Sequence, residues 1–184
     1  PRLPFAPMRR LAPLALAALG VSLVVPAAAS VAAAAPRPSL LPCTVQHLHY
    51  ESPVIHLQPG QNTINYDNLP LTIGGVPMRP DVAGWITGIT PNLIYTDGSI
   101  PPVDIIHLHH AVWLNASRGD WTTPGIPERF FATGEEKTAM SLPRPYGYRY
   151  DPADSWVLNH MLHVLDDQAH DVRLTWDLDF VPAT

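Results

Sequence analysis

The chain has 184 residues, of which 46% are hydrophobic, and it carries 11 basic against 16 acidic residues, a formal net charge of −5 at pH 7. This acidic balance disfavours nucleic acid and anionic membrane surfaces as partners, and it weakly favours cations. The single cysteine, Cys43, excludes an internal disulfide framework.

Residues 1–35 have the features of a secretory signal peptide with a few residues upstream of it. Arg9 and Arg10 form a basic start, Leu11–Val25 is apolar, and small residues precede an expected cleavage after Ala35. The apolar run has about 15 residues, fewer than the roughly 20 that a membrane-spanning helix needs. We therefore expect a secreted protein with no stable membrane anchor. Its mature chain would keep 8 basic and 16 acidic residues, a net charge of −8.

After the leader, residues 36–43 are expected to form a proline-rich linker and residues 44–184 a single all-β domain. Seventeen prolines lie between Pro36 and Pro182, a density that interrupts helices. Pro91 marks its surroundings as an edge strand or a bulged strand. Strands are expected, in chain order, at residues 44–51, 54–57, 62–66, 83–90, 92–95, 103–115, 129–132, 139–142, 156–165 and 171–181, with loops at 67–80 and 116–127. Short strands separated by frequent turns predict an antiparallel β-sandwich of jelly-roll type.

The last expected strand, 171–181, has the most regular alternation in the chain. One face is apolar and should lie in the core, and the other is polar and should meet solvent. The inward residues are Val172, Leu174, Trp176, Leu178 and Phe180, and the outward ones are Arg173, Thr175, Asp177 and Asp179.

The strand at 103–115 carries three of the nine histidines, in the run His107-Leu108-His109-His110. Alternation predicts that His107 and His109 share a face with Ile105, Ala111 and Trp113. It places His110 on the opposite face with Ile106, Leu108, Val112 and Leu114. Two imidazoles at this spacing on one face of a strand can reach a common metal ion.

The strand at 156–165 supplies further candidate ligands. Met161 and His163 are expected on one face, and His160 on the other. Thioether sulfur suits Cu(I), whereas imidazole suits copper, zinc or iron. Copper is therefore the expected ion if Met161 binds, and zinc competes if only histidines bind. The candidate metal ligands are His107, His109, His110, His160, Met161 and His163.

Plainer roles exist for several of these residues. A single core histidine is more often a hydrogen-bonded packing residue than a ligand, and Met161 alone is more often core filler. His47, His49 and His56 are candidates for surface residues, although His47 and His49 repeat the pair spacing. No phosphate-binding glycine loop, serine nucleophile elbow or His-Glu-x-x-His motif is present.

Two blocks of the sequence resemble a known family. DIIHLHHAVWLN and the stretch from ERFFATGEEKT through PYGYRY to WVLNHMLHVL and VRLTWDLDFV are similar to stress-up-regulated nodulin-type proteins, which plants contain and bacteria secrete. The layout is also similar to one half of the copper type II, ascorbate-dependent monooxygenases, which have jelly-roll domains and bind copper through His and Met. That resemblance implies that His109-His110, or His107 with His109, matches the histidine pair, and that Met161 or His163 completes a site. Those enzymes have two domains and several disulfides, whereas this chain predicts one domain and has one cysteine.

The sequence thus predicts a secreted β-sandwich that binds a transition metal, with copper first and zinc second, and that handles the metal or uses it in redox or monooxygenase-like chemistry. The alternative is a metal-free extracellular jelly-roll module. In that case the histidines pack inside the sandwich, and a glycan or protein partner binds exposed aromatic residues. The aromatic candidates are Trp121, Tyr146, Tyr148 and Tyr150.

Overall fold

The structure, a computed structural model, describes residues 44–183. This part of the chain contains twelve β-strands, joined by turns and loops, and no helix. The predicted signal peptide and linker, with Cys43, lie outside the described residues. The strands are β1 (Gln46–Glu51), β2 (Ile55–Leu57), β3 (Asn62–Leu69), β4 (Thr72–Ile73), β5 (Val76–Pro77), β6 (Gly84–Tyr95), β7 (Ile106–Gly119), β8 (Pro127–Gly134), β9 (Met140–Ser141), β10 (Tyr148–Tyr150), β11 (Trp156–Val164) and β12 (His170–Pro182).

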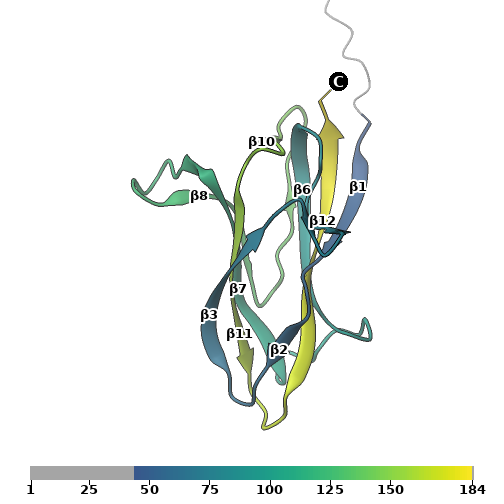
Figure 1. The fold of residues 1–184 in the computed structure, drawn as a ribbon, viewed down its shortest axis with the longest axis vertical. Coiled ribbons are helices and arrows are strands. Elements are labelled where there is room, and N and C mark those ends of the chain that lie inside the picture. The colour runs from purple at the N-terminus through teal and green to yellow at the C-terminus, as the bar shows by residue number, and fades with distance from the viewer. Residues whose placement is uncertain (1–43, 184) are drawn as a thin grey trace, which may run out of the picture. The chain divides into compact units, whose positions relative to one another are not determined.

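These strands form two principal antiparallel sheets that face each other (Figure 1). Sheet A has the order β1-β12-β6-β10, with β2 beside β12 and β9 beside β6. Sheet B has the order β3-β11-β7-β8, and β4 with β5 forms a separate small hairpin. The antiparallel β-sandwich is therefore confirmed. The jelly-roll type stays a prediction.

Aromatic side chains from both sheets meet in the core. Trp176 of β12 and Trp113 of β7 pack edge to face, with ring centroids 5.9 Å apart and an interplanar angle of 71°. Tyr150 of β10 meets Trp156 of β11 at 5.1 Å. Burial of one such aromatic side chain contributes on the order of 4 kcal/mol from removed apolar area.

The alternation predicted for the last strand is confirmed. Its five apolar residues are almost completely buried, while Asp177 is exposed and Arg173 and Asp179 are half-buried. Thr175 is an exception: it pairs with Glu51 of β1 and Asn92 of β6 and is buried, although its neighbours on that face are not.

The segments on either side of Pro91 form one strand, β6, rather than two. A bulge lies in it, because Asp179 pairs with Gly88 and Phe180 with Ile86, which leaves Thr87 without a partner on β12. Pro91 pairs with Trp176 on β12, and on the opposite side of β6 the pairings of β9 and β10 end before it. A proline without an N–H is therefore accommodated where β6 has a free edge.

The two predicted loops are shorter than expected. β3 continues to Leu69, and the hairpin of β4 and β5 turns at Gly74 and Gly75, both with positive φ. β7 likewise continues to Gly119. Within residues 44–183 no helix is long and apolar enough to cross a membrane.

Candidate functional site

A β-bulge in β7 lies in the middle of the His-Leu-His-His run. On β11, Met161 pairs with His110, but the next residue, Leu162, pairs with Leu108. His109 is therefore an extra residue in β7 without a direct partner on β11. Such an insertion interrupts the alternation of side chains along the strand.

The bulge changes which residues share a face. Before it, Ile106 and Leu108 are buried in the core, and after it the buried positions are Ala111 and Trp113. The prediction that His107 and His109 share a face with Ala111 and Trp113 is therefore wrong. So is the prediction that His110 points away from them. All three histidines of β7 belong to the outer face of sheet B, because the bulge shifts the phase of alternation by one residue.

A fourth histidine joins them from β11. His163 pairs with His107 across the two strands, and their ring centroids are 4.6 Å apart. The ring of His163 also stacks on that of His109 at 4.8 Å, with an interplanar angle of 25°. We call His107, His109, His110 and His163 the histidine cluster.

Two ring nitrogens of the cluster lie particularly close together. Nδ1 of His109 is 3.1 Å from Nδ1 of His110. Nε2 of His110 lies 2.9 Å from Oδ1 of Asn159, while the amide nitrogen of Asn159 donates to the carbonyl oxygen of Asn65 at 3.3 Å. This network assigns the proton of neutral His110 to Nε2, so its Nδ1 accepts the hydrogen bond that Nδ1–H of His109 donates.

The environment keeps part of the cluster uncharged. Burial is the main cause that lowers the pKa of His110, and it outweighs the hydrogen bond with Asn159, which raises that pKa. Burial also lowers the pKa of His163, with a further contribution from the neighbouring imidazoles of His107 and His109. Among the described residues, Nε2 of His163 is one of the few buried side-chain nitrogens without a hydrogen-bond partner. Both effects leave imidazole lone pairs available to a ligand.

The other five histidines are held differently, because each has a carboxylate partner. Four of these pairs lie on sheet A or at its end, and one lies on sheet B. The pairs are His47–Asp179 at 2.6 Å, His49–Asp177 at 2.6 Å, His56–Asp171 at 2.7 Å, His160–Asp67 at 2.8 Å and His170–Asp166 at 2.9 Å. Within residues 44–183 no hydrogen bond or ion pair joins the histidine cluster to a carboxylate. The cluster is thus distinguished by imidazoles that contact mainly one another.

The remaining two candidate ligands on β11 lie on opposite faces, as predicted. His160 is 2% exposed and belongs to the core-facing side of sheet B, where Asp67 binds it. Met161 is half-buried on the outer face and pairs directly with His110. The structure therefore brings together four of the six candidates, places Met161 beside them in register, and separates His160 from them by the sheet.

The donor set of the cluster fits a transition metal in type, and two of its nitrogens fit in separation. Two nitrogens bound to one ion at about 2.0–2.1 Å lie about 3 Å apart, close to the Nδ1 pair of His109 and His110. As the side chains stand, however, no group of three or more His, Cys, Asp or Glu residues within 44–183 is arranged to hold a metal ion. A third ligand requires rotation of His107 or His163.

Asn159 is a site residue that the sequence reasoning missed. It lies on the outer face of sheet B and is 9% exposed. The available signal was an amide directly before His160 in an otherwise apolar strand. An amide there indicates a hydrogen-bonding role, since a buried polar group needs a partner.

The four aromatic residues of the alternative prediction differ in solvent exposure. Trp121 is 92% exposed, and Tyr146 is also exposed. Tyr150 is 1% exposed and bonds Pro80 and Arg79, and Tyr148 is half-buried. The prediction of Tyr148 and Tyr150 as contact residues is therefore wrong, because alternate residues of β10 turn toward the interior of the sandwich.

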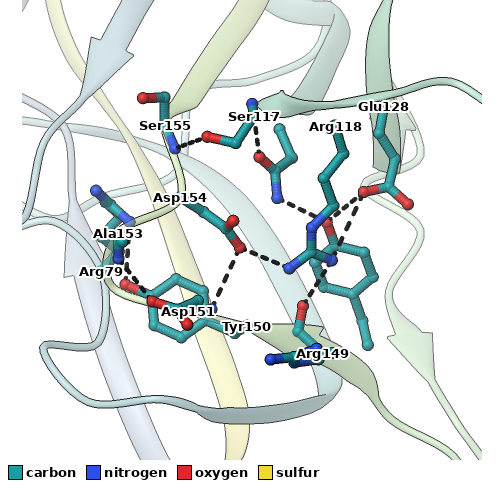
Figure 2. A network of polar contacts seen from close by, with 12 residues as sticks. Arg79, Ser117, Arg118, Glu128, Arg149, Tyr150, Asp151, Ala153, Asp154 and Ser155 are labelled. Atoms are coloured by element: carbon teal, nitrogen blue, oxygen red, sulfur yellow. Dashed lines mark hydrogen bonds and ion pairs between the residues drawn. The ribbon is translucent and has the colours of Figure 1, made fainter.

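Figure 2 shows a network of polar contacts that includes Arg118, Glu128 and Asp154. Tyr148 belongs to the same network. Its hydroxyl donates to Glu128 at 2.8 Å and accepts from Asn115 at 3.1 Å. Arg118 lies over its ring and donates to the buried carboxylate of Asp154 at 2.8 Å. The network joins β7, β8 and β10 and has a structural explanation, since each buried charge has a partner.

A surface hollow of about 390 Å³ lies beside Trp121. It is lined by Trp121, Asp120, Thr122, Glu128, Arg129 and Ala132. Asp120 holds Arg129 at 2.9 Å, so one wall of the hollow is an ion pair.

Comparisons of the chain with protein-family models, with curated proteins and with solved structures found no match.

Proposed function

We propose that this protein binds a transition-metal ion at the histidine cluster on the outer face of sheet B, with copper as the first ion to test and zinc as the second. The observation that carries the proposal is the Nδ1 pair of His109 and His110, 3.1 Å apart, beside the imidazoles of His107 on the same strand and His163 on β11. Imidazole is a good ligand for both ions.

In this proposal Nδ1 of His110 is the first ligand, and Nδ1 of His109 is the second once the proton that it donates to His110 moves to its own Nε2. His163 supplies the third after rotation of its ring, and its buried, unpartnered Nε2 supports this role. Met161 lies across from His110 and offers a thioether, which favours Cu(I). Asn159 is a positioning residue, because it holds the proton of His110 on the nitrogen that faces away from His109.

Bound copper would supply one-electron redox chemistry. Consumption of O₂ with ascorbate as reductant separates a metal carrier from an enzyme that turns over a substrate. We also propose that the protein is secreted, from the leader at residues 1–35, and that it is related to the nodulin-type family. The strand orders of the two sheets support a jelly-roll type for the sandwich.

The test uses protein purified without a histidine tag and stripped of metal with a chelator. Titration with Cu(II) should saturate at a defined stoichiometry, and the EPR spectrum should show hyperfine coupling to imidazole nitrogen. His109→Ala and His110→Ala should each weaken binding by at least tenfold. His56→Ala is the matched control, since His56 is exposed and paired with Asp171. Equal binding by all four proteins, or none by the wild type, would refute the proposal.

A second candidate function rests on Trp121. An indole that is 92% exposed beside a hollow of about 390 Å³ is the kind of feature that glycan or protein partners contact. In this alternative the protein is a metal-free extracellular interaction module. Binding to a panel of polysaccharides, lost in Trp121→Ala and retained in His109→Ala, would favour it over metal binding.

A further inference from the structure

A second hollow, of about 200 Å³, lies at one edge of the sandwich, where β3 comes close to the link between β1 and β2. Both sheets and the β4–β5 hairpin contribute to its lining, which is mainly apolar. The apolar wall is formed by Pro53, Val54, Leu69, Ile73 and Leu158. Leu69 and Leu158 belong to the core and are 2% and 1% exposed, so the hollow reaches the interior of the sandwich.

Asp67 is the one formally charged residue in this lining. It pairs with the buried Leu158 of β11, and paired residues share a face, so its side chain leaves β3 on the core-facing side. Because β3 is the edge strand of sheet B, the side chain of Asp67 is still 56% exposed. An accessible carboxylate therefore lies at the rim of a mainly apolar hollow, and no basic residue of the described chain lines it.

A buried histidine holds this carboxylate in place. Nε2 of His160 lies 2.8 Å from Oδ2 of Asp67, and His160 is 2% exposed. Nε2 carries the proton, because an ionised carboxylate only accepts hydrogen bonds. Nδ1 of the same ring is buried and has no hydrogen-bond partner among the described residues. The ring is thus oriented by Asp67 alone, and it leaves Oδ1 of Asp67 without a hydrogen bond from any residue in 44–183.

We propose that this hollow binds a small organic cation, an ammonium group on a short apolar chain. The ammonium group donates to Oδ1 of Asp67, and the chain packs against the apolar wall. An alkylammonium group stays charged at pH 7, and the net charge of −5 attracts it. Small-molecule sites are mostly apolar with a few polar groups, and they usually measure about 300–1,000 Å³. A hollow of about 200 Å³ therefore takes only a short chain.

This site is separate from the histidine cluster. His160 lies on the core-facing side of β11, whereas His163 lies on its outer face. The inference therefore does not depend on metal binding, and either proposal can fail without the other.

Titration with the primary amines from propylamine to hexylamine, followed by amide NMR shifts, tests the inference. The protein is first dialysed against a chelator, so that no amine binds through a metal ion. Each methylene that enters the hollow should strengthen binding about fourfold, until the hollow is full. The shifts should be concentrated at Asp67, Leu69 and Ile73. Hexanol lacks the charge and hexanoate has the opposite charge, so both should bind at least tenfold more weakly than hexylamine.

Two variants separate the charge from the apolar wall. Asp67→Asn keeps the shape of the side chain and should weaken hexylamine binding by tenfold or more. Asp177→Asn is the matched control, because Asp177 is also paired with a histidine and its side chain is 60% exposed. It should bind hexylamine like the wild type. Ile73→Ala, on the short β4–β5 hairpin, should reduce the gain in affinity from each added methylene and leave the binding of propylamine nearly unchanged.

His160 is a positioning residue in this proposal. Its ring nitrogen shifts should move when hexylamine binds and should not move with hexanol, because only the amine contacts the carboxylate that the ring holds. His160→Gln can still donate an N–H to Asp67, whereas His160→Leu cannot, so the leucine variant should bind the amine more weakly than the glutamine variant. Circular dichroism of each variant confirms that it is folded.

Several results would overturn the inference. Equal binding of hexanol or hexanoate would show that charge does not select the ligand. Equal losses in Asp67→Asn and Asp177→Asn would show that amines are attracted only by the net charge of the protein. Shifts confined to residues away from the hollow, or no saturable binding of any amine, would exclude this site. His160 shifts that do not respond to hexylamine would show that the ring only packs in the core.

Discussion

Asn159 accepts a hydrogen bond from Nε2 of His110 at 2.9 Å and thereby determines which nitrogen of that imidazole carries the proton. The other nitrogen, Nδ1, keeps its lone pair and accepts a hydrogen bond from Nδ1 of His109 at 3.1 Å. The side-chain amide of Asn159 on β11 thus fixes the tautomer of His110 on β7.

Replacement of Asn159 should therefore weaken metal binding without removal of a ligand. Asn159→Ala frees His110 to carry its proton on either nitrogen, and partners of metal ligands typically contribute 10–100-fold in affinity. We expect a tenfold or greater rise in the Cu(II) dissociation constant by isothermal titration calorimetry. Asn68→Ala, at an exposed position on the same face, should leave affinity unchanged. Equal affinity in the two variants would contradict the role of Asn159.

Deletion of His109 should be tolerated by the fold, because it removes the extra residue of the bulge and restores regular alternation between Leu108 and His110. Deletion of Val112 has the opposite effect, since it turns Trp113 or its neighbours to the wrong face. We expect cooperative thermal unfolding for the first variant and loss of folding for the second. The deletion of His109 should also abolish metal binding. An unfolded first variant would show that the bulge is required by the sheet.

Acid should destabilise the protein through His163 and His110. Burial lowers their pKa values in the folded state below the ordinary value of about 6.5 for histidine, so the unfolded chain binds more protons as pH falls through that value. The stability they contribute is complete above about pH 6.5 and is lost as pH falls toward their folded pKa values. Urea unfolding at pH 7, 6 and 5 should show this decline. His163→Leu should make it shallower, and an unchanged slope would contradict the assignment.

His49 should act in the opposite direction. Its hydrogen bond with Asp177 is the main cause that raises its pKa, so its contribution is complete below about pH 6.5 and is lost as pH rises through the folded pKa. The pair is exposed, which limits the effect to less than about 1 kcal/mol. His49→Gln should therefore lower the free energy of unfolding slightly at pH 5 and not at pH 8. A larger loss at pH 8 would contradict this account.

The core should depend strongly on the contact between the two sheets. Trp176→Ala removes a buried indole that packs on Trp113 and should lower the free energy of unfolding by about 3–5 kcal/mol. Trp121→Ala, at a fully solvated indole, should change it by no more than about 0.5 kcal/mol. Urea unfolding of both variants measures the difference. Similar losses in the two would show that Trp176 is not central to the core.

The sequence alone determined the parts of this protein that depend on local periodicity. The density of prolines excluded helices, and alternation along 171–181 identified the core face of β12. Two strands rich in histidine were identified as sources of candidate metal ligands. Alternation also placed Met161 and His163 on the face opposite His160. These signals are local, because the alternation of apolar and polar residues within one strand is enough to predict which of its side chains are buried.

Only the tertiary structure decided which imidazoles meet. The bulge at His109 comes from pairing with β11, so alternation within β7 placed His110 on the wrong face. The tautomer of His110 depends on Asn159, which lies 49 residues away in the chain. The burial of Tyr150 follows from its packing against Trp156 and Phe180 of other strands. Each of these features depends on contacts between strands that are distant in sequence, and a single-strand pattern does not contain them.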